Sequence, residues 1–278
     1  MRISWQRLFQ LLNTGLFGLL GLSLFSLGFP VQAEANVSLA PLISKSIQFK
    51  PTNMPPPGRG TLRTPYGTGS RGDCPVNADL PGLSQLVGNR GLDKTVSDRP
   101  SFWVYVPYTQ AEVSGGRFLL QTDDTEVYRQ EIQLPAMPGI IAISLPETLA
   151  PLEVGRSYRW YFEVTCPQQD PTGGAAPATV TGVVERVVPS EELVSELAIA
   201  QSVLEQVAAY AENGIWYDTF TTLAQMRQDA PENAELNEIW QEMLRDPGVG
   251  LADWADALIV GNVVGSGANQ QPSEPELN

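Results

Sequence analysis

The ten residues 99–108, Arg-Pro-Ser-Phe-Trp-Val-Tyr-Val-Pro-Tyr, constrain the fold of this chain more than any other stretch. In an extended chain, successive side chains point to opposite faces. One face would therefore carry Phe102, Val104 and Val106, and the other would carry Trp103 and Tyr105. Large apolar side chains on both faces are typical of a strand that is buried on both sides or that forms an aromatic-rich edge. We therefore expect the central strand of a β-sandwich here.

Further short strands follow, separated by residues that favour turns. The expected strands are residues 117–122, 126–134, 139–145, 158–166 and 179–188. Gly115-Gly116, Asp123-Asp124 and Pro146 separate them, at about the spacing that a two-sheet sandwich needs. The pattern predicts an immunoglobulin-like antiparallel β-sandwich over residues 73–188. An unrelated two-sheet topology would give the same pattern.

The most specific local signal lies before and along the strand at residues 158–166. Leu152, Gly155 and Tyr158 have the spacing of the tyrosine corner found in immunoglobulin and fibronectin type III sandwiches. In that corner the tyrosine hydroxyl bonds to the backbone a few residues upstream. We expect Tyr158 to bond in this way.

After Pro189 the apolar period changes from that of strands to that of helices. Ser190 can cap a helix whose apolar stripe comprises Leu193, Leu197, Ala200, Leu204, Val207 and Ala211. Asn213-Gly214 ends this helix, and further helices are expected at residues 216–228, around residues 236–244 and, briefly, at 251–259. The fold class is therefore α+β, with a small helical domain over residues 190–264 and a disordered tail over 265–278.

Tyr210, Gly214, Leu223 and Pro231 stand at the relative spacings of a tetratricopeptide unit. A second full copy is absent, and such repeats need several neighbours for stability. We therefore expect a tetratricopeptide-like domain that packs on itself or on the sandwich. Peptide recognition by these helices is the alternative.

The N-terminus predicts export. Arg2 and Arg7 precede an apolar run over residues 8–29, and small residues end at Ala33, where we place signal-peptide cleavage. A retained membrane anchor is the alternative, because the run approaches the length of a membrane span. After cleavage we expect no stable span and a periplasmic or extracellular location, and a thylakoid lumen also fits. Residues 34–72 are rich in Pro and Gly, which predicts a disordered linker without a stable core.

Charge and cysteine content limit the partners further. The formal net charge of −14 becomes −16 when the two arginines of the signal peptide are removed. An acidic protein of this kind is repelled by nucleic acid and by anionic membrane surfaces. Cys74 and Cys166 are the only cysteines, and in an oxidising compartment they predict one disulfide.

The available chemistry is mostly defined by what the sequence lacks. It contains no His, which excludes the ordinary His-dependent catalytic and metal sites, and no Gly-rich phosphate loop. We therefore expect no catalytic residues, no metal and no cofactor. Asp123, Asp124 and Glu126 could serve a carboxylate-dependent hydrolase of envelope polysaccharide, although a solvated hairpin turn is the favoured interpretation.

Aromatic residues offer a second candidate surface. Trp103, Tyr105, Tyr108 and Tyr161 could stack on sugars or form a protein interface, together with Asp123, Asp124 and Glu126. The favoured interpretation is that the aromatic side chains fill the core. Both readings remain open from the sequence alone.

Several motifs resemble those of the domain of unknown function 928 family, which is found chiefly in cyanobacteria. They are Gly69-Ser70-Arg71-Gly72-Asp73-Cys74-Pro75, the whole of residues 99–108, Leu152-Glu153-Val154-Gly155, Gly182-Val183-Val184-Glu185 and Gly214-Ile215-Trp216-Tyr217-Asp218. The resemblance covers residues 55–258 and implies no established activity. We expect an exported, non-enzymatic binding or envelope-associated module whose partner is a protein or glycan of the cell envelope.

Overall fold

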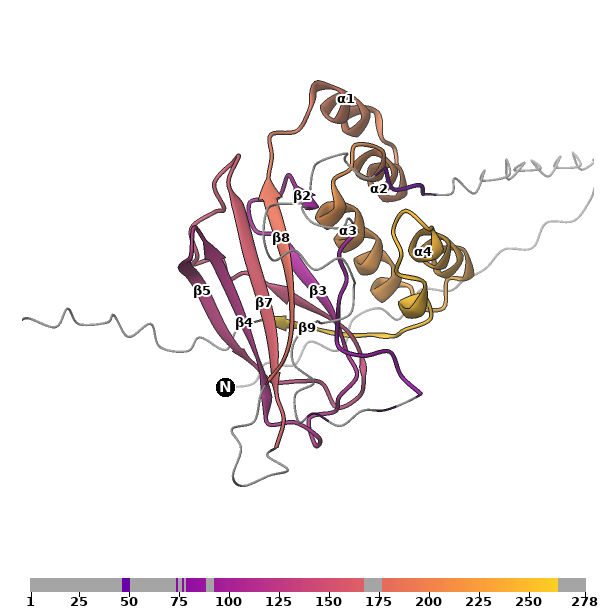
Figure 1. Cartoon of the computed structure of the whole chain (residues 1–278). Coiled ribbons are helices and arrows are strands. Elements are labelled where there is room, and N and C mark those ends of the chain that lie inside the picture. The colour runs from indigo at the N-terminus through magenta and orange to yellow at the C-terminus, as the bar shows by residue number, and fades with distance from the viewer. Residues whose placement is uncertain are drawn as a thin grey trace, which may run out of the picture. The chain divides into compact units, whose positions relative to one another are not determined.

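A computed structural model describes residues 47–50, 74, 77, 79–88, 93–167 and 177–264 (Figure 1). The predicted signal peptide, most of the predicted linker and the predicted C-terminal tail lie outside these residues. The described part combines β-strands in two sheets with four α-helices and is therefore α+β.

The strands in the described residues are β1 (Ser84–Gln85), β2 (Asp93–Thr95), β3 (Ser101–Val106), β4 (Gly115–Thr122), β5 (Thr125–Ile132), β6 (Gly139–Ser144), β7 (Ser157–Thr165), β8 (Ala178–Arg186) and β9 (Ile259–Val264). Six of these strands agree closely with those expected from the alternation of side chains, and three, β1, β2 and β9, were not expected. The helices are α1 (Glu191–Ile199), α2 (Val203–Glu212), α3 (Trp216–Asp229), α4 (Ala234–Arg245) and the short 3-10 helix η1 (Ala252–Trp254).

The two sheets are mixed, which corrects the expectation of a purely antiparallel sandwich. One sheet has the order β1-β3-β6-β9 and the other has the order β2-β8-β7-β4-β5. β2 pairs with β8 in parallel, and β9 pairs with β6 in parallel. β9 enters the sheet only after the chain has passed through all the helices, and no local pattern in the sequence indicated this return.

The sheets pack face to face through aromatic side chains. The ring of Phe102 on β3 lies 4.9 Å from the ring of Phe118 on β4 and 5.7 Å from that of Trp160 on β7. All three side chains are fully buried. Phe102 is thus the central contact between the two sheets.

The opposite face of β3 is covered by α3 (Figure 1). The ring of Trp103 lies 5.5 Å from that of Phe220, and Trp103 Nε1 donates a hydrogen bond to Thr221 Oγ1 at 2.9 Å. Phe220 also packs against Trp216 and Trp240. β3 is therefore buried on both faces, as its sequence predicted, with a sheet on one side and helices on the other.

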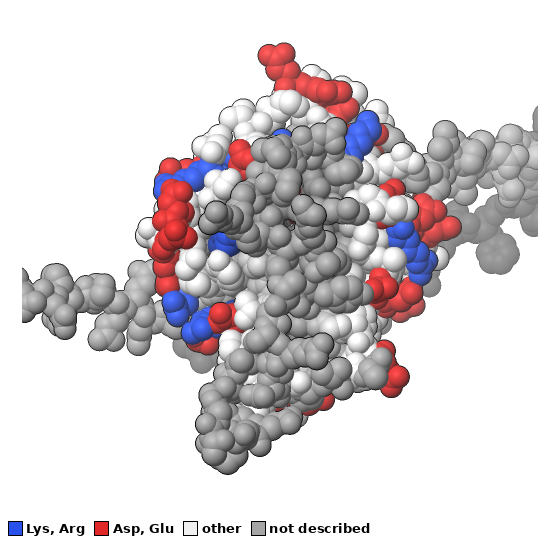
Figure 2. All heavy atoms as spheres, viewed as in Figure 1, with Lys and Arg blue, Asp and Glu red and all other residues white. Residues whose placement is uncertain are grey.

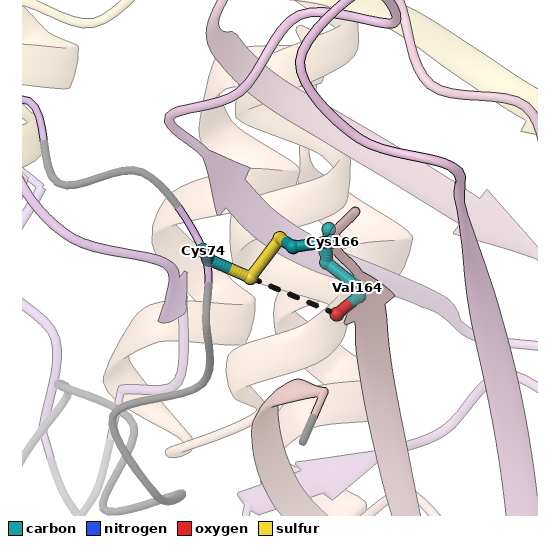
Figure 3. Close-up of a disulfide and its surroundings, with 3 residues drawn as sticks. All are labelled: Cys74, Val164 and Cys166. Carbon is teal, nitrogen blue, oxygen red and sulfur yellow. Dashed lines mark hydrogen bonds between the residues drawn. A yellow bond between two sulfur atoms is a disulfide. The ribbon is translucent and has the colours of Figure 1, made fainter. Parts of the chain in front are cut away.

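Two local predictions about covalent and polar anchors are confirmed. Glu153 N donates a hydrogen bond to the Tyr158 hydroxyl at 2.9 Å, which is the bond of a tyrosine corner. Cys74 and Cys166 form a disulfide with a Cα–Cα distance of 5.1 Å (Figure 3). Cys74 Sγ lies 4.0 Å from Val164 O, and this is a van der Waals contact because a disulfide sulfur carries no proton.

Three predictions about the helices and the linker were wrong in detail. The expected helix from Ser190 to Asn213 is broken into α1 and α2, and the expected helix at 251–259 is η1 followed by β9. The expectation of no core in residues 34–72 fails at Ile47 and Phe49, which are buried. Phe49 packs edge-on against Trp216 with ring centroids 4.9 Å apart.

The predicted division into a sandwich (73–188) and a helical domain (190–264) stays a prediction. Side chains from both segments belong to one hydrophobic cluster, which includes Phe102, Trp160, Phe220 and Trp240. β9 also returns from the second segment to a sheet of the first.

Candidate binding surface

The aromatic residues of the opening motif do not form a surface. Trp103, Tyr105 and Tyr108 expose only 2%, 4% and 9% of their area. They lie in the core because β3 is covered on both faces. The prediction that they offer a binding platform was therefore wrong, and the core interpretation holds for them.

Tyr161 lies on the outer face of the five-stranded sheet and is half-buried. Its neighbours across the strands are Leu119 on β4 and Thr181 on β8. The next row of the sheet carries an ion pair between Arg117 and Glu163. Among these neighbours Tyr161 is the one aromatic ring, beside the apolar Leu119 and otherwise charged and polar side chains, which is the usual composition of a solvated sheet face.

Asp123 and Asp124 form the two-residue turn between β4 and β5. Both have positive φ values, 49° and 62°, which a tight hairpin turn requires. Asp123 accepts a hydrogen bond from Arg156 at 2.9 Å, and Arg156 also pairs with Glu153 at 2.9 Å. The favoured interpretation of a solvated hairpin turn accounts for both residues.

Glu126 is likewise engaged by a neighbouring arginine. Arg129 donates hydrogen bonds to Glu126 from Nε, at 3.1 Å and 3.2 Å to the two carboxylate oxygens, and from Nη2 at 2.6 Å. These bonds hold the pKa of the Glu126 carboxyl below its usual value. A general acid for glycoside cleavage needs a raised pKa. Asp123 and Glu126 therefore neutralise separate arginines, and neither has the environment of a catalytic acid.

Asp218 lies in the first turn of α3. The sequence identified it only as part of the family motif at residues 214–218. Its Oδ2 accepts hydrogen bonds from Thr95 Oγ1 at 2.7 Å and from Val96 N at 3.1 Å. Burial raises the pKa of the Asp218 carboxyl, and the bonds from Thr95 and Val96 oppose this shift. Asp218 joins α3 to the end of β2, which is a structural role.

The other members of the same motif make similar joints. Trp216 Nε1 donates to Leu86 O at 3.1 Å, and Trp160 Nε1 donates to the Tyr217 hydroxyl at 2.8 Å. Gly214 has a φ of 69°, which suits the glycine that ends α2. The motif at residues 214–218 therefore holds the helices against both sheets.

Metal binding and membrane insertion find no support in the described residues. They contain no group of three or more carboxylate, cysteine or histidine side chains arranged to hold a metal ion. Among the same residues, no helix combines the length and the apolar character needed to cross a membrane.

Four exposed aliphatic side chains lie close together in the sequence, on α1 and just before and after it. Val188 is 70% exposed, Val194 54%, Ile199 76% and Val203 46%. The other large apolar side chains that are exposed in the described part, Met137, Val154 and Leu258, are far from one another in the sequence. Scattered exposed apolar residues are normal, whereas a concentration of them marks an interaction site.

Four glutamates stand among these side chains: Glu191, Glu192, Glu196 and Glu205. We call the four aliphatic residues and the four glutamates together the α1 surface. Figure 2 shows acidic atoms gathered at the top of the view, where α1 lies in Figure 1. The α1 surface is apolar at its aliphatic side chains and negatively charged between them.

The break between α1 and α2 gives this surface its position. Ala200 has a non-helical ψ of 125°, and the Ser202 hydroxyl accepts a hydrogen bond from Glu205 N. Glu205 Oε2 in turn accepts a hydrogen bond from Gln201 N at 2.6 Å. The side chains of Ser202 and Glu205 thus each accept a bond from a backbone N–H group at the start of α2, as in a capping box. The Ser-x-x-Glu spacing at residues 202–205 was the sequence signal for this break, and the search for a continuous apolar stripe missed it.

α1 is held on one side only. Leu193 is its one buried residue, and it packs with Ala209 of α2 and Ile215 in a small cluster separate from the main core. Ser190 caps the helix by accepting a hydrogen bond from Leu193 N at 3.1 Å, as predicted. Among the described residues, no other side chain of α1 is buried, and Asn213 Nδ2 donates a hydrogen bond to Glu196 Oε2 at 2.7 Å.

Comparisons with known proteins identify a family and no activity. The model of the family described as Domain of Unknown Function (DUF928) matches residues 66–259. No curated protein matches the chain. One similar solved structure is the CARDB domain of the PF1109 protein from Pyrococcus furiosus, in complex with di-metal ions. It is 13% identical and covers 41% of this chain and 100% of its own, with a TM-score of 0.24, too low to carry an argument.

Proposed function

This chain belongs to the family described as Domain of Unknown Function (DUF928), and from that premise we propose that it is an exported, non-enzymatic binding module. Its α1 surface docks a protein partner of the cell envelope. The observation that carries this proposal is the exposure of Val194 and Ile199 on α1, a helix anchored by one buried side chain, and of Val188 and Val203 just before and after it.

A protein partner fits this surface better than a glycan. Sugars are usually held by stacking on aromatic rings, and the aromatic residues first considered for that role are buried or stand alone. Aliphatic side chains are instead buried against other apolar side chains, which a folded or folding protein segment supplies.

The absence of catalysis is supported by the engagement of the polar side chains. Within the described residues, Asp123 and Glu126 pair with arginines and Asp218 bonds β2 to α3. Export is supported by the disulfide between Cys74 and Cys166, because such bonds persist in oxidising compartments.

The same proposal extends to the finer description of the fold. The tyrosine corner at Tyr158 supports an immunoglobulin-like sandwich, and the succession of α2 and α3 with a turn at Gly214 supports a tetratricopeptide-like pair. The pair packs on the sandwich instead of forming a solenoid.

Site-specific photo-crosslinking in the exporting cells tests the function. A photoreactive residue is placed at position 199 of the full-length chain, and a matched one replaces Val154, which is 51% exposed between β6 and β7. We expect a discrete crosslinked protein from position 199 and none from position 154. Equal adducts from both positions, or no adduct from position 199, would contradict the proposal.

A further inference from the structure

The charge of this protein is concentrated in its helices. Residues 190–258 contain 14 acidic side chains and only two basic ones, Arg227 and Arg245, a net of −12. The whole chain has 31 acidic and 17 basic residues and a net charge of −14. The helices therefore generate most of the negative potential that an approaching partner meets.

The sequence around the α1 surface carries no positive charge, and in the fold the exposed Lys50 lies at the far, C-terminal end of α2, where its backbone N–H donates to Ala211 O at 3.0 Å. Between Arg186 and Arg227 there is neither Lys nor Arg. Among the described residues, the ion pairs all lie elsewhere, and none of them includes a glutamate of the α1 surface. The carboxylates of Glu191 and Glu192 are exposed at the first turn of α1, whose helix dipole favours negative charge there.

We propose that the α1 surface recognises a basic amphipathic segment of the partner. Apolar side chains of that segment contact Ile199 and Val203 at the turn between α1 and α2, and its Lys or Arg side chains pair with the surrounding glutamates. This inference rests on the proposed function and adds the chemistry of the partner. The negative charge of these glutamates excludes the α1 surface of a second copy as the partner, since two such surfaces would repel each other. It also opposes docking on anionic lipid.

The two kinds of contact have separable consequences. Burial of aliphatic side chains supplies affinity that is insensitive to salt, whereas exposed ion pairs are screened at high ionic strength. Complementary charge also raises the association rate. A partner with this chemistry must therefore lose affinity both when its apolar face is disrupted and when salt is added.

Three synthetic peptides serve as probes for the full-length mature chain, measured by fluorescence anisotropy. The first is a helical Leu/Lys peptide with one apolar face, the second has the same composition in a shuffled order, and the third has Glu in place of Lys. We expect saturable binding of the first, at least tenfold weaker binding of the second and none of the third. Raising the salt concentration from 50 to 500 mM should weaken the binding of the first peptide several-fold, as expected for exposed ion pairs.

Variants of exposed residues locate the site without disturbing the core. The pair Ile199→Ser and Val203→Ser keeps the charge and should weaken binding about tenfold or more, as loss of two buried aliphatic contacts predicts. Met137→Ser is the matched control, because Met137 is 53% exposed outside the helices, and it should change nothing.

A second pair tests the charge. Glu191→Gln with Glu192→Gln should weaken binding several-fold and flatten its salt dependence. Glu235→Gln with Glu238→Gln, on the exposed side of α4, removes the same charge elsewhere and should change the dissociation constant less than about twofold. Circular dichroism confirms that α1 is retained in each variant.

The outcomes separate this inference from the proposed function. Equal binding of the Glu peptide, or unchanged binding by the Ile199/Val203 variant, would overturn the basic amphipathic partner. A specific crosslink from position 199 would then still support docking at α1. Failure of all three peptides to bind the folded protein would also overturn the inference.

Discussion

At the scale of single residues, the family motif at residues 214–218 is explained as a joint between helices and sheets. Trp216, Tyr217 and Asp218 each hydrogen-bond to a different part of the β-structure, at Leu86, at Trp160 and at Thr95 with Val96. Their burial makes them architectural.

Asp218 makes the stability of the protein depend on pH. Because burial raises its pKa in the folded state, the folded protein holds this proton more tightly than the unfolded chain does. Its contribution to the free energy of unfolding therefore falls as pH rises from the unfolded pKa through the folded one. Asp218→Asn keeps an oxygen that can accept both bonds and removes this titration.

We therefore expect the stability of Asp218→Asn relative to the wild type to increase as pH rises above about 4, the ordinary aspartate value. Urea unfolding of both proteins across the acidic pH range measures the difference between their free energies of unfolding. The contributions of the other titrating groups cancel in this difference. A difference that shrinks as pH rises would show that the folded pKa is lowered and would contradict the assignment.

At the scale of elements, the position of α3 depends on a residue without a side chain. A Cβ atom added to Gly88 would lie 1.9 Å from Cε3 of Trp216, so any side chain there must displace the start of α3. Gly88→Ala should destabilise the protein by about 1–3 kcal/mol, the usual cost of overpacking.

Gly82→Ala is the matched control for this prediction, because nothing lies within 4 Å of its added Cβ atom. It should change stability by no more than about 0.5 kcal/mol. Chemical denaturation of both variants measures the difference. Equal stability of the two alanine variants would show that Trp216 does not pack against Gly88 in solution.

The elements also show what could be predicted from the sequence. β7 was predicted to within one residue at each end, and β3 lies inside the predicted stretch 99–108, because their alternation of large side chains is local. β9 was missed because its pairing with β6 is a long-range event. Ile47 and Phe49 were missed because two apolar residues in a polar segment give no periodic signal.

The α1 surface was missed for a different reason. The apolar stripe that includes Leu193 and Leu197 predicted the buried face of the helix. The aliphatic residues outside this stripe were not considered as a surface. Val194 and Ile199 lie off that stripe, which was the available signal. Of the predicted site residues, Cys74 and Cys166 meet as expected, whereas Trp103 and Tyr105 are core residues.

At the scale of the whole molecule, the disulfide ties Cys74 to the end of β7 across 92 residues of sequence. Closing a loop of this length in the unfolded chain stabilises the folded state by about 4–5 kcal/mol. Cys74→Ser with Cys166→Ser should lose about this amount in urea unfolding. Reductant should destabilise the wild type comparably and leave the double variant unchanged; a loss below about 1 kcal/mol would contradict the prediction.

The helices and the sandwich should also fold as one unit. A chain that ends at residue 188 lacks α3 and β9, so Trp103 and Tyr105 would lose the cover of Phe220 and its neighbours. We expect this fragment to show no cooperative thermal transition and to bind a hydrophobic dye. A fragment with a sharp transition and native-like near-ultraviolet circular dichroism would instead establish the sandwich as an independent domain.

The central claim is that the protein works through the α1 surface and not through its sheets. Amide hydrogen exchange of the full-length mature protein, with and without the Leu/Lys peptide, tests it most directly. The account predicts added protection confined to residues 188–206, with none in β4, β5 or β7. Protection on the outer face of the five-stranded sheet around Tyr161, or no protection at α1, would contradict it.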